Sequence, residues 1–355
     1  MNILILGAGR IGSLIANYLS DKFDLTIIDS SEKNLEKVEK YGKIEKNILQ
    51  NERDIYNVVK NFKLVVGALP ANFGNKTVKS CIQASSNLVD ISFMKENSLK
   101  YNKKAKENEV TIIPDAGFAP GLSNLFVGRI FQYYDKLEEC GIRVGGLPLK
   151  KVPPLYYKIT WSPKDLIEEY TRKARIINNN NIIKLDPLEN INKVNIKNYE
   201  FEDFFSDGLR TLLETIDVPN LWETTLRWKG HLKKIKTLRE LNFFSDENIN
   251  KTLKIISPLM NFKSRDFSIM EIISKGIKND RIKELKYFLY DEEKNNFKSM
   301  SRVTGFTAAV ITELMANRNF DSGIYPLEII GFNKNLHDII INKLRKQGIR
   351  IEITF

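Results

Sequence analysis

The chain has 355 residues, a formal net charge of +11 and an isoelectric point near 9.3. Hydrophobic residues make up 42% of it and the mean hydropathy is −0.29, values typical of a soluble globular protein. No apolar stretch approaches the roughly 20 residues that a membrane-spanning helix needs, and the length predicts two domains.

The charge pattern and the rare residue types restrict the partners that we expect. Lysines alternate with glutamates, as in residues 32–37, which is typical of a solvated helix face rather than of a nucleic-acid surface. The only cysteines are Cys81 and Cys140, and the only histidines are His231 and His337. We therefore expect no disulfide framework and no metal site. The chain begins directly with an apolar strand and no basic leader, so a cytoplasmic location is predicted.

The first elements form an ordered pattern. Residues 1–6 are an apolar, strand-like run, and Gly7-Ala8-Gly9-Arg10-Ile11-Gly12 follows at once. Residues 13–19 have helical spacing, and a second apolar run over 25–28 ends at Asp29. Strand, glycine turn, helix, strand and acid together are the context of a dinucleotide-binding fingerprint.

Each part of this fingerprint has a physical role. Gly7 permits the tight turn, Gly9 leaves room for a pyrophosphate, and Gly12 lets the helix pack closely on the sheet. The helix N-terminus at Arg10 and Ile11 offers N–H groups to the phosphates. The Asp29 carboxylate would accept hydrogen bonds from the adenosine ribose hydroxyls and would repel a 2′-phosphate. Asp29 therefore predicts NAD rather than NADP. Arg10 and Lys33 are nearby cations that could oppose this preference, and the alternative is a glycine turn that binds nothing.

The rest of the first third continues the alternation. Strands are predicted at 64–70, where the strand runs into a loop, at 88–92 and at 110–113, with helices at 76–84 and 97–108 between them. This order predicts a parallel, doubly wound sheet, in which ligands bind beyond the carboxyl ends of the strands. The cofactor-binding residues expected there are Ala68, Leu69, Pro70, Asp90 and Ile91.

A second domain follows the first, because the pattern changes after residue 122. Residues 141–148 and 156–161 are β-rich, 178–181 is a polar turn, and 184–205 contains short β-like pieces. A helix over 301–317 is predicted to return and pack on the first domain, and the tail is predicted as a helix over 336–347 and a strand over 349–355. The predicted fold is α/β, with a Rossmann domain (1–122, joined by a late helix near 303–320) and a mixed α+β substrate and dimerisation domain (123–355).

Motifs along nearly the whole chain resemble those of the saccharopine dehydrogenase superfamily. Within it, the chain is most similar to the lysine 6-dehydrogenase branch. The motifs, in order, are Asp115-Ala116-Gly117-Phe118-Ala119-Pro120-Gly121-Leu122-Ser123, Gly145-Gly146-Leu147-Pro148, Trp161-Ser162-Pro163, Glu169-Tyr170-Thr171, Asp207-Gly208-Leu209-Arg210-Thr211-Leu212, Thr225-Leu226-Arg227, Gly230-His231, Ser301-Arg302, Thr304-Gly305-Phe306 and Tyr325-Pro326-Leu327-Glu328.

The resemblance implies an activity. It implies a homodimeric, NAD-dependent oxidoreductase that would oxidise the ε-amine of L-lysine to allysine. Allysine would then cyclise to piperideine-6-carboxylate. Saccharopine-cleaving relatives carry an acid where this chain has Ala119, which favours lysine over saccharopine. Two further departures are Lys229, where a proline is usual, and Asn47, where an aspartate is common. The alternatives are a saccharopine dehydrogenase, a related reductive C–N-condensing enzyme, or an NAD(H)-sensing regulatory module without catalysis.

Candidate catalytic residues follow from the chemistry of an amine substrate. An ammonium cannot release a hydride from its α-carbon, so a base or a dry pocket must keep the amine neutral. Asp115 is the first candidate base, with a turn-capping role as its alternative. His231 is the second, with a surface or core histidine as its alternative.

Substrate-binding residues are expected from the same motifs. An α-carboxylate requires a fork of N–H donors, which arginine supplies. Arg210 and Arg227 match the superfamily's substrate-binding arginines, and each could instead form an ion pair. The resemblance adds hydroxyl contacts from Tyr170 and Thr225, and it places Ser92 and Phe93 against both substrate and nicotinamide.

Overall fold

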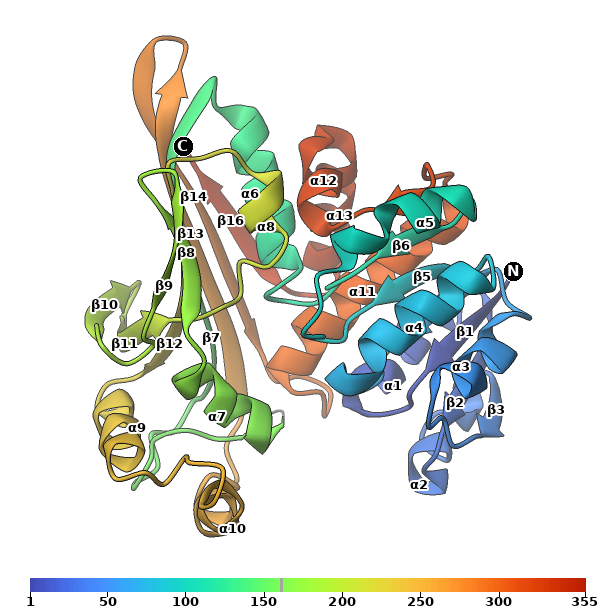
Figure 1. Cartoon of the computed structure of the whole chain (residues 1–355), viewed down its shortest axis with the longest axis horizontal. Helices are drawn as coiled ribbons and strands as arrows, with labels where there is room; N and C mark the ends of the chain where they lie inside the picture. The colour runs from blue at the N-terminus through green and yellow to red at the C-terminus, as the bar shows by residue number, and fades with distance from the viewer. Residues whose placement is uncertain (160–161) are drawn as a thin grey trace. The chain divides into compact units, whose positions relative to one another are not determined.

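The computed structural model describes residues 1–159 and 162–355, which form two compact units. Unit 1 contains Met1–Arg129 and Ser301–Gly348, and unit 2 contains Ile130–Met300 and Ile349–Phe355. Each unit has a β-sheet of its own (Figure 1). The chain passes from unit 1 into unit 2 within helix α6 (Leu122–Tyr133) and returns near the start of helix α11 (Ser299–Asn317).

Unit 1 contains the parallel, doubly wound sheet that the sequence predicts. Its strand order is β15-β6-β5-β4-β1-β2-β3, and every neighbouring pair is parallel. The short strands β3 and β15 are additions that the sequence pattern did not indicate. The bounds are β1 Asn2–Leu6, β2 Asp24–Asp29, β3 Lys43–Lys46, β4 Leu64–Gly67, β5 Asn87–Asp90, β6 Thr111–Ile113 and β15 Gly323–Ile324.

Helices and a buried apolar core surround this sheet. Strand residues such as Leu4, Val65 and Ile112 pack against Ile55 and Val78 from two helices on one face. The predicted helix over 76–84 begins earlier, directly after Pro70, which occupies the N-cap position. The helices are α1 Arg10–Leu19, α2 Glu32–Leu35, α3 Glu52–Val59, α4 Ala71–Gln83, α5 Asn102–Glu107, α12 Leu327–Phe332 and α13 Lys334–Lys346, with short 3₁₀ turns at Glu39–Tyr41 and Ser98–Tyr101.

The late helix α11 lies against α1. Gly305 faces Leu14 so closely that a Cβ there would lie 2.8 Å from the leucine side chain. Next along the two helices, Tyr18 meets Phe306 edge to face at 6.0 Å and donates a 2.7 Å hydrogen bond to Glu313. Small residues at this crossing therefore let the two helices approach closely.

Unit 2 contains a mixed sheet of nine strands among the described residues. Its main path is β10-β11-β12-β7-β13-β14-β16, with β8 pairing β12 and β9. Only β7 and β12 are paired in parallel; the other pairs are antiparallel. The bounds are β7 Lys136–Pro148, β8 Ala174–Asn178, β9 Asn181–Leu185, β10 Asn192–Ile196, β11 Tyr199–Phe205, β12 Asn220–Trp228, β13 Asp266–Lys278, β14 Arg281–Glu292 and β16 Arg350–Thr354.

Several predicted elements of unit 2 are confirmed, and one is wrong. The polar turn joins β8 to β9, with Asn179 and Asn180 at φ 47° and 63°, the left-handed values of a tight hairpin turn. Residues 156–159 form no strand, because Tyr156 also has a positive φ of 58° and Pro153 and Pro154 before it lack N–H donors. Residues 160 and 161 of that prediction, and thus Trp161 of the quoted motif, lie outside the described residues.

Aromatic side chains dominate the core of unit 2. Phe201, Phe204, Trp228 and Phe267 are buried among Leu, Ile and Tyr residues of the sheet and of the helices beside it. The helices of this unit are α7 Pro163–Thr171, α8 Leu212–Thr215, α9 His231–Glu240 and α10 Ile249–Leu259.

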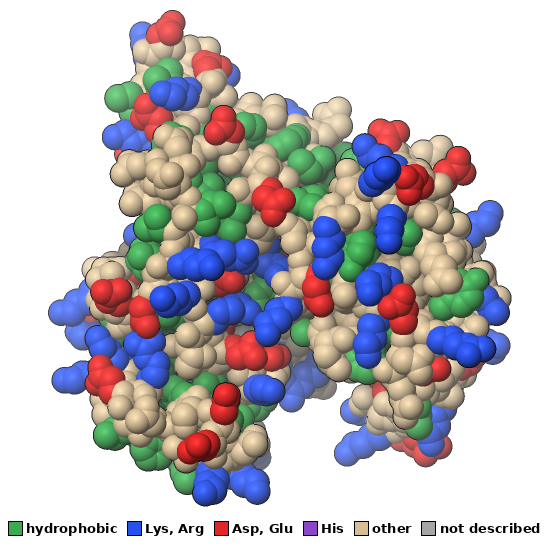
Figure 2. All heavy atoms as spheres, viewed as in Figure 1, with side chains coloured by type: hydrophobic (Ala, Val, Ile, Leu, Met, Phe, Trp, Pro, Cys, Tyr) green, Lys and Arg blue, Asp and Glu red, His purple; other side chains and the backbone are tan. Residues whose placement is uncertain are grey.

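The surface carries charges of both signs. In Figure 2, lysine and arginine side chains lie beside aspartates and glutamates over both units. No helix in the described ranges is both long and apolar enough to cross a lipid bilayer.

Candidate functional site

The glycine turn has the geometry that its sequence requires. Gly7 has a φ of +100°, and a Cβ at Gly12 would overlap the carbonyl oxygen of Gly7. A Cβ at Gly9, in contrast, would meet nothing within 4 Å. Helix α1 begins at the next residue without a side-chain cap, so space and uncapped helix N–H groups occur together, as an anionic ligand requires.

Asp29 ends β2 beside this turn. One carboxylate oxygen accepts the Ala8 N–H at 2.7 Å, and the other accepts the Ser31 N–H at 2.8 Å. Among residues 1–159 and 162–355, no lysine or arginine forms an ion pair with Asp29. The carboxylate is therefore held against the turn by two backbone N–H groups.

Two buried acids lie at or just beyond the carboxyl ends of β5 and β6: Asp90 and Asp115. Asp90 accepts the Ser92 N–H at 2.9 Å and the Ser92 hydroxyl. Glycines permit this packing, since a Cβ at Gly67 would overlap Asp90 and one at Gly74 would overlap Ser92. Burial raises the pKa of Asp90 to about 7, with the nearby charge of Asp115 acting in the same direction and Ser92 opposing both.

The loop that carries Asp115 is tightly folded. Asp115 is buried and has a φ of 50°, and its carbonyl oxygen accepts the Gly117 N–H at 2.8 Å. Gly121, with a φ of 130°, comes so close that a Cβ there would lie 2.5 Å from the Asp115 carbonyl oxygen. The remaining predicted cofactor residues of unit 1, which directly follow β4 and β5, are half-buried or exposed: Ala68, Leu69, Pro70 and Ile91.

In unit 2, one face of β12 carries buried polar side chains. Glu223, Thr225 and Arg227 alternate along the strand and therefore share a face. Arg227 donates to Tyr170 Oη at 2.8 Å, to Glu169 at 2.7 Å and to the Leu226 carbonyl oxygen at 3.0 Å. The Arg227 guanidinium also packs on the rings of Tyr157, Tyr170 and Phe204.

His231 is enclosed in the same core. Its Nδ1–H donates to the Leu155 carbonyl oxygen at 2.6 Å, so Nε2 must accept the Tyr170 hydroxyl at 2.9 Å. Burial, together with the positive charge of the neighbouring Arg227, lowers the pKa of His231 to about 3. The Tyr170 hydroxyl thus donates a hydrogen bond to His231 and accepts one from Arg227. All three side chains are part of the packed interior of unit 2.

The loop after β11 carries the second predicted arginine. Arg210 is half-buried with a φ of 54°, and three residues before it Asp207 receives a two-pronged bond from Arg175 at 2.7 and 3.1 Å. Arg172 lies 3.5 Å from the same carboxylate. The ion pairs therefore fix the base of the loop that presents Arg210.

Some site residues were not found by sequence reasoning. Glu223 and Ser206 had no assigned role, and Glu169 was quoted only as part of a motif. The available signal was the alternation of polar residues at 223, 225 and 227, which indicates one strand face once β12 is recognised as a strand.

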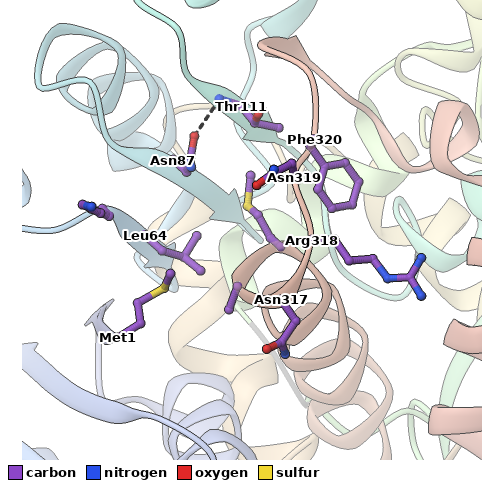
Figure 3. A pocket seen from close by; sticks show the side chains of 11 residues that line it. Met1, Leu64, Asn87, Thr111, Asn317, Arg318, Asn319 and Phe320 are labelled. Carbon is purple, nitrogen blue, oxygen red and sulfur yellow. Dashed lines mark hydrogen bonds between the residues drawn. The ribbon is translucent and has the colours of Figure 1, made fainter.

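A separate pocket of about 320 Å³ lies in unit 1 (Figure 3). It is lined by Met1, Leu64, Asn87 and Thr111, which lie at the amino ends of four parallel strands, and by residues 315–320 at the end of α11 and beyond. Ligands of doubly wound folds bind at the carboxyl ends, so this pocket is distinct from the glycine turn.

Two domain models of one family together match nearly the whole chain. Residues 3–113 match the saccharopine dehydrogenase NADP binding domain, and residues 117–349 match the saccharopine dehydrogenase C-terminal domain. The chain belongs to the saccharopine dehydrogenase family. This confirms the family resemblance and the fold class, while NAD and NADP are not distinguished by it.

Individual relatives of this saccharopine dehydrogenase family member are distant. The mitochondrial alpha-aminoadipic semialdehyde synthase of Bos taurus is 22% identical over 267 residues, covering 68% of this chain and 28% of that protein. The saccharopine dehydrogenase [NADP(+), L-glutamate-forming] of Pyricularia oryzae is 22% identical over 52% of this chain and 44% of that protein. The chain thus spans about a quarter of the first relative's length and less than half of the second's.

A solved structure shares the fold over the full length. The apo saccharopine dehydrogenase (L-Glu forming) from Saccharomyces cerevisiae superposes with a TM-score of 0.83 at 16% identity, covering 100% of both chains. At this identity the likeness establishes the fold alone.

Proposed function

We propose that this chain is an NAD-dependent dehydrogenase that oxidises the ε-amine of L-lysine to allysine. The observation that carries the redox assignment is the glycine turn, in which space at Gly9, the uncapped start of α1 and the Asp29 carboxylate occur together. Bound NAD would accept the hydride, and this chain's own residues would bind both molecules and move the proton. Family membership supports the amino-acid substrate.

We propose lysine rather than saccharopine as the substrate because of one residue, Ala119. Ala119 replaces the acid that saccharopine-cleaving enzymes carry before the Pro-Gly pair. The second candidate, oxidation of saccharopine, is favoured by the names of the relatives above. NADH absorbance in the near ultraviolet, measured after adding L-lysine, saccharopine or buffer alone to protein and NAD, separates the candidates. A signal with saccharopine only would replace the lysine proposal, and no signal with either would favour a nucleotide-sensing module.

The catalytic base in this proposal is Asp115. It is buried at the carboxyl end of the sheet that carries the glycine turn. His231 has both ring nitrogens engaged and a strongly lowered pKa, so we assign it to the structure of unit 2. Arg210 is proposed to anchor the substrate carboxylate. We also propose a cytoplasmic location and a homodimer; light scattering on the purified protein tests the dimer.

Cofactor preference is the first testable consequence. We expect a catalytic efficiency at least about tenfold higher with NAD than with NADP, equivalent to about 1.4 kcal/mol. Asp29 would repel the 2′-phosphate, and no cation pairs with its carboxylate among the described residues. Changing Asp29→Ser together with Ser30→Arg should reverse the preference. Equal efficiency of the wild type with both cofactors would contradict this expectation.

A pair of glycine variants tests the turn itself. Gly9→Ala should leave the unfolding temperature nearly unchanged but abolish NAD binding, because the added methyl group occupies open space that the pyrophosphate needs. Gly12→Ala should lower the unfolding temperature even without NAD, since its methyl group would overlap the Gly7 carbonyl oxygen. Differential scanning fluorimetry with and without NAD measures both. Normal NAD binding by Gly9→Ala would contradict the proposed cofactor position.

A further inference from the structure

Two buried polar side chains join helices α6 and α12 in unit 1. The Asn124 side chain donates from Nδ2 to Oε2 of Glu328 at 3.1 Å, and Glu328 is fully buried. A buried carboxylate costs stability unless donors hold it, and an apolar pair would join two helices without that cost. The choice of these two residues therefore indicates a role beyond packing.

The backbones of α6 and α12 approach closely beside this pair. A Cβ at Gly128 of α6 would lie 2.1 Å from the Glu328 carbonyl oxygen, and one at Gly331 of α12 would lie 2.2 Å from the Leu125 carbonyl oxygen. A side chain at either glycine would push the two helices apart. The helices, and the Glu328 carboxylate with them, are thus held in one arrangement.

Asn124 also holds the first turn of α6. Its Oδ1 accepts the Gly121 N–H at 3.1 Å and the Ser123 hydroxyl at 3.1 Å. Asn124 is the third residue of the helix and Gly121 directly precedes the helix, so the bond to Gly121 is one half of a capping box. The Gly121 N–H can only donate and the Glu328 carboxylate can only accept. Together they fix the orientation of the Asn124 amide.

Gly121 closes the loop that carries Asp115. It has a φ of 130°, and a Cβ there would lie 2.5 Å from the Asp115 carbonyl oxygen and 2.3 Å from the Gly117 carbonyl oxygen. The next residue, Leu122, donates its N–H to the same Gly117 oxygen at 2.9 Å. A displacement of Gly121 is therefore transmitted to the backbone of Asp115, because the two are in close contact.

We propose that Glu328 is a positioning residue for Asp115 and acts through Asn124 and Gly121. The inference rests on the proposed function, in which Asp115 takes the proton from the substrate amine. Proton transfer requires the base within hydrogen-bond reach of the amine, and a misplacement of about 1 Å can reduce a rate about a hundredfold. The Glu328–Asn124 pair keeps the base in place without itself touching the substrate or the cofactor.

Steady-state kinetics with the amino acid that the wild type oxidises test this role. Glu328→Met removes the acceptor, and Asn124→Ala removes the link from its other end. Each variant should lower kcat about tenfold to a hundredfold and change KM and NAD affinity less than about twofold, since neither side chain binds a ligand. The double variant should lose no more than Asn124→Ala alone, because both changes break one link. Additive losses would contradict a shared path.

Hydrogen exchange tests the loop without turnover. Amides of the segment 115–125, followed by mass spectrometry, should exchange at least about tenfold faster in Glu328→Met than in the wild type, because a loosened loop opens more often. The matched control is Ile330→Ala, which removes a buried apolar side chain from the same helix. It should lower the unfolding temperature in differential scanning fluorimetry but leave kcat and the exchange of this segment unchanged.

The outcomes separate the inference from the proposed function. Unchanged kcat in folded Glu328→Met and Asn124→Ala would overturn the inference and leave the proposed function intact. Faster exchange with unchanged kcat would also overturn it, since Glu328 would then hold the loop but not position the base. Equal losses of kcat in Ile330→Ala would show a general effect of α12 and have the same consequence. A wild type that oxidises no amino acid would overturn the proposed function, and the inference with it.

Discussion

Arg227→Met is expected to lower the free energy of unfolding by about 3–5 kcal/mol, the usual cost of breaking a buried ion pair. Methionine keeps much of the stem but removes every donor. The fully buried Tyr170 then loses a partner without regaining water, and the partly exposed Glu169 loses its cation. Urea unfolding followed by tryptophan fluorescence measures the loss in unit 2, because all three tryptophans fall between residues 130 and 300.

A second arginine provides the control for this loss. Arg265 pairs with Glu292 at 2.7 Å, but its side chain is 60% exposed. Arg265→Met should therefore cost about 0–1 kcal/mol, as expected for exposed pairs. If Arg227→Met cost no more than Arg265→Met, the Arg227 contacts would not be structural. Arg227 would then return as a candidate anchor for the substrate carboxylate.

The sequence predicts the glycine turn well because its interactions are short-range. Gly7, Gly12 and Asp29 lie within one strand–helix–strand segment, so a fixed spacing implies a fixed geometry. The alternation of strands and helices up to residue 113 is equally local. In unit 2, strands β12 and β13 are not predicted, because both carry buried polar residues, such as Glu223 and Ser268, that interrupt the apolar pattern.

The polar cluster of unit 2 could not be predicted from spacing. Tyr170 lies 57 positions before Arg227 and 61 before His231, yet its hydroxyl bonds both. Sequence reasoning proposes His231 as a base and Arg227 as a substrate anchor, because the sequence does not show that Tyr170 binds both side chains. With those contacts, the donors of both side chains are largely used inside the fold.

Asp115→Asn is expected to reduce turnover of lysine by roughly 10²–10⁴, the usual contribution of a positioned general base. The ε-amine has a reference pKa of about 10.4 and arrives mostly as an ammonium, so wild-type turnover should rise toward alkaline pH. Asparagine has nearly the same shape, and it tolerates the left-handed backbone that Asp115 adopts at φ 50°. Stopped-flow formation of NADH across pH measures the loss, and fluorimetry with NAD checks that fold and cofactor affinity persist.

His231→Asn, run in parallel, separates chemistry from packing. It breaks the bond to Tyr170 deep in unit 2, so we expect a lower unfolding temperature but an unchanged alkaline rise of turnover in the folded fraction. If Asp115→Asn turned over lysine normally while folded His231→Asn was inactive, the histidine would be the base despite its enclosure. If both stayed active, neither side chain would take the proton. Exclusion of water around the amine would then be enough to keep it neutral, because desolvation alone disfavours the charged form.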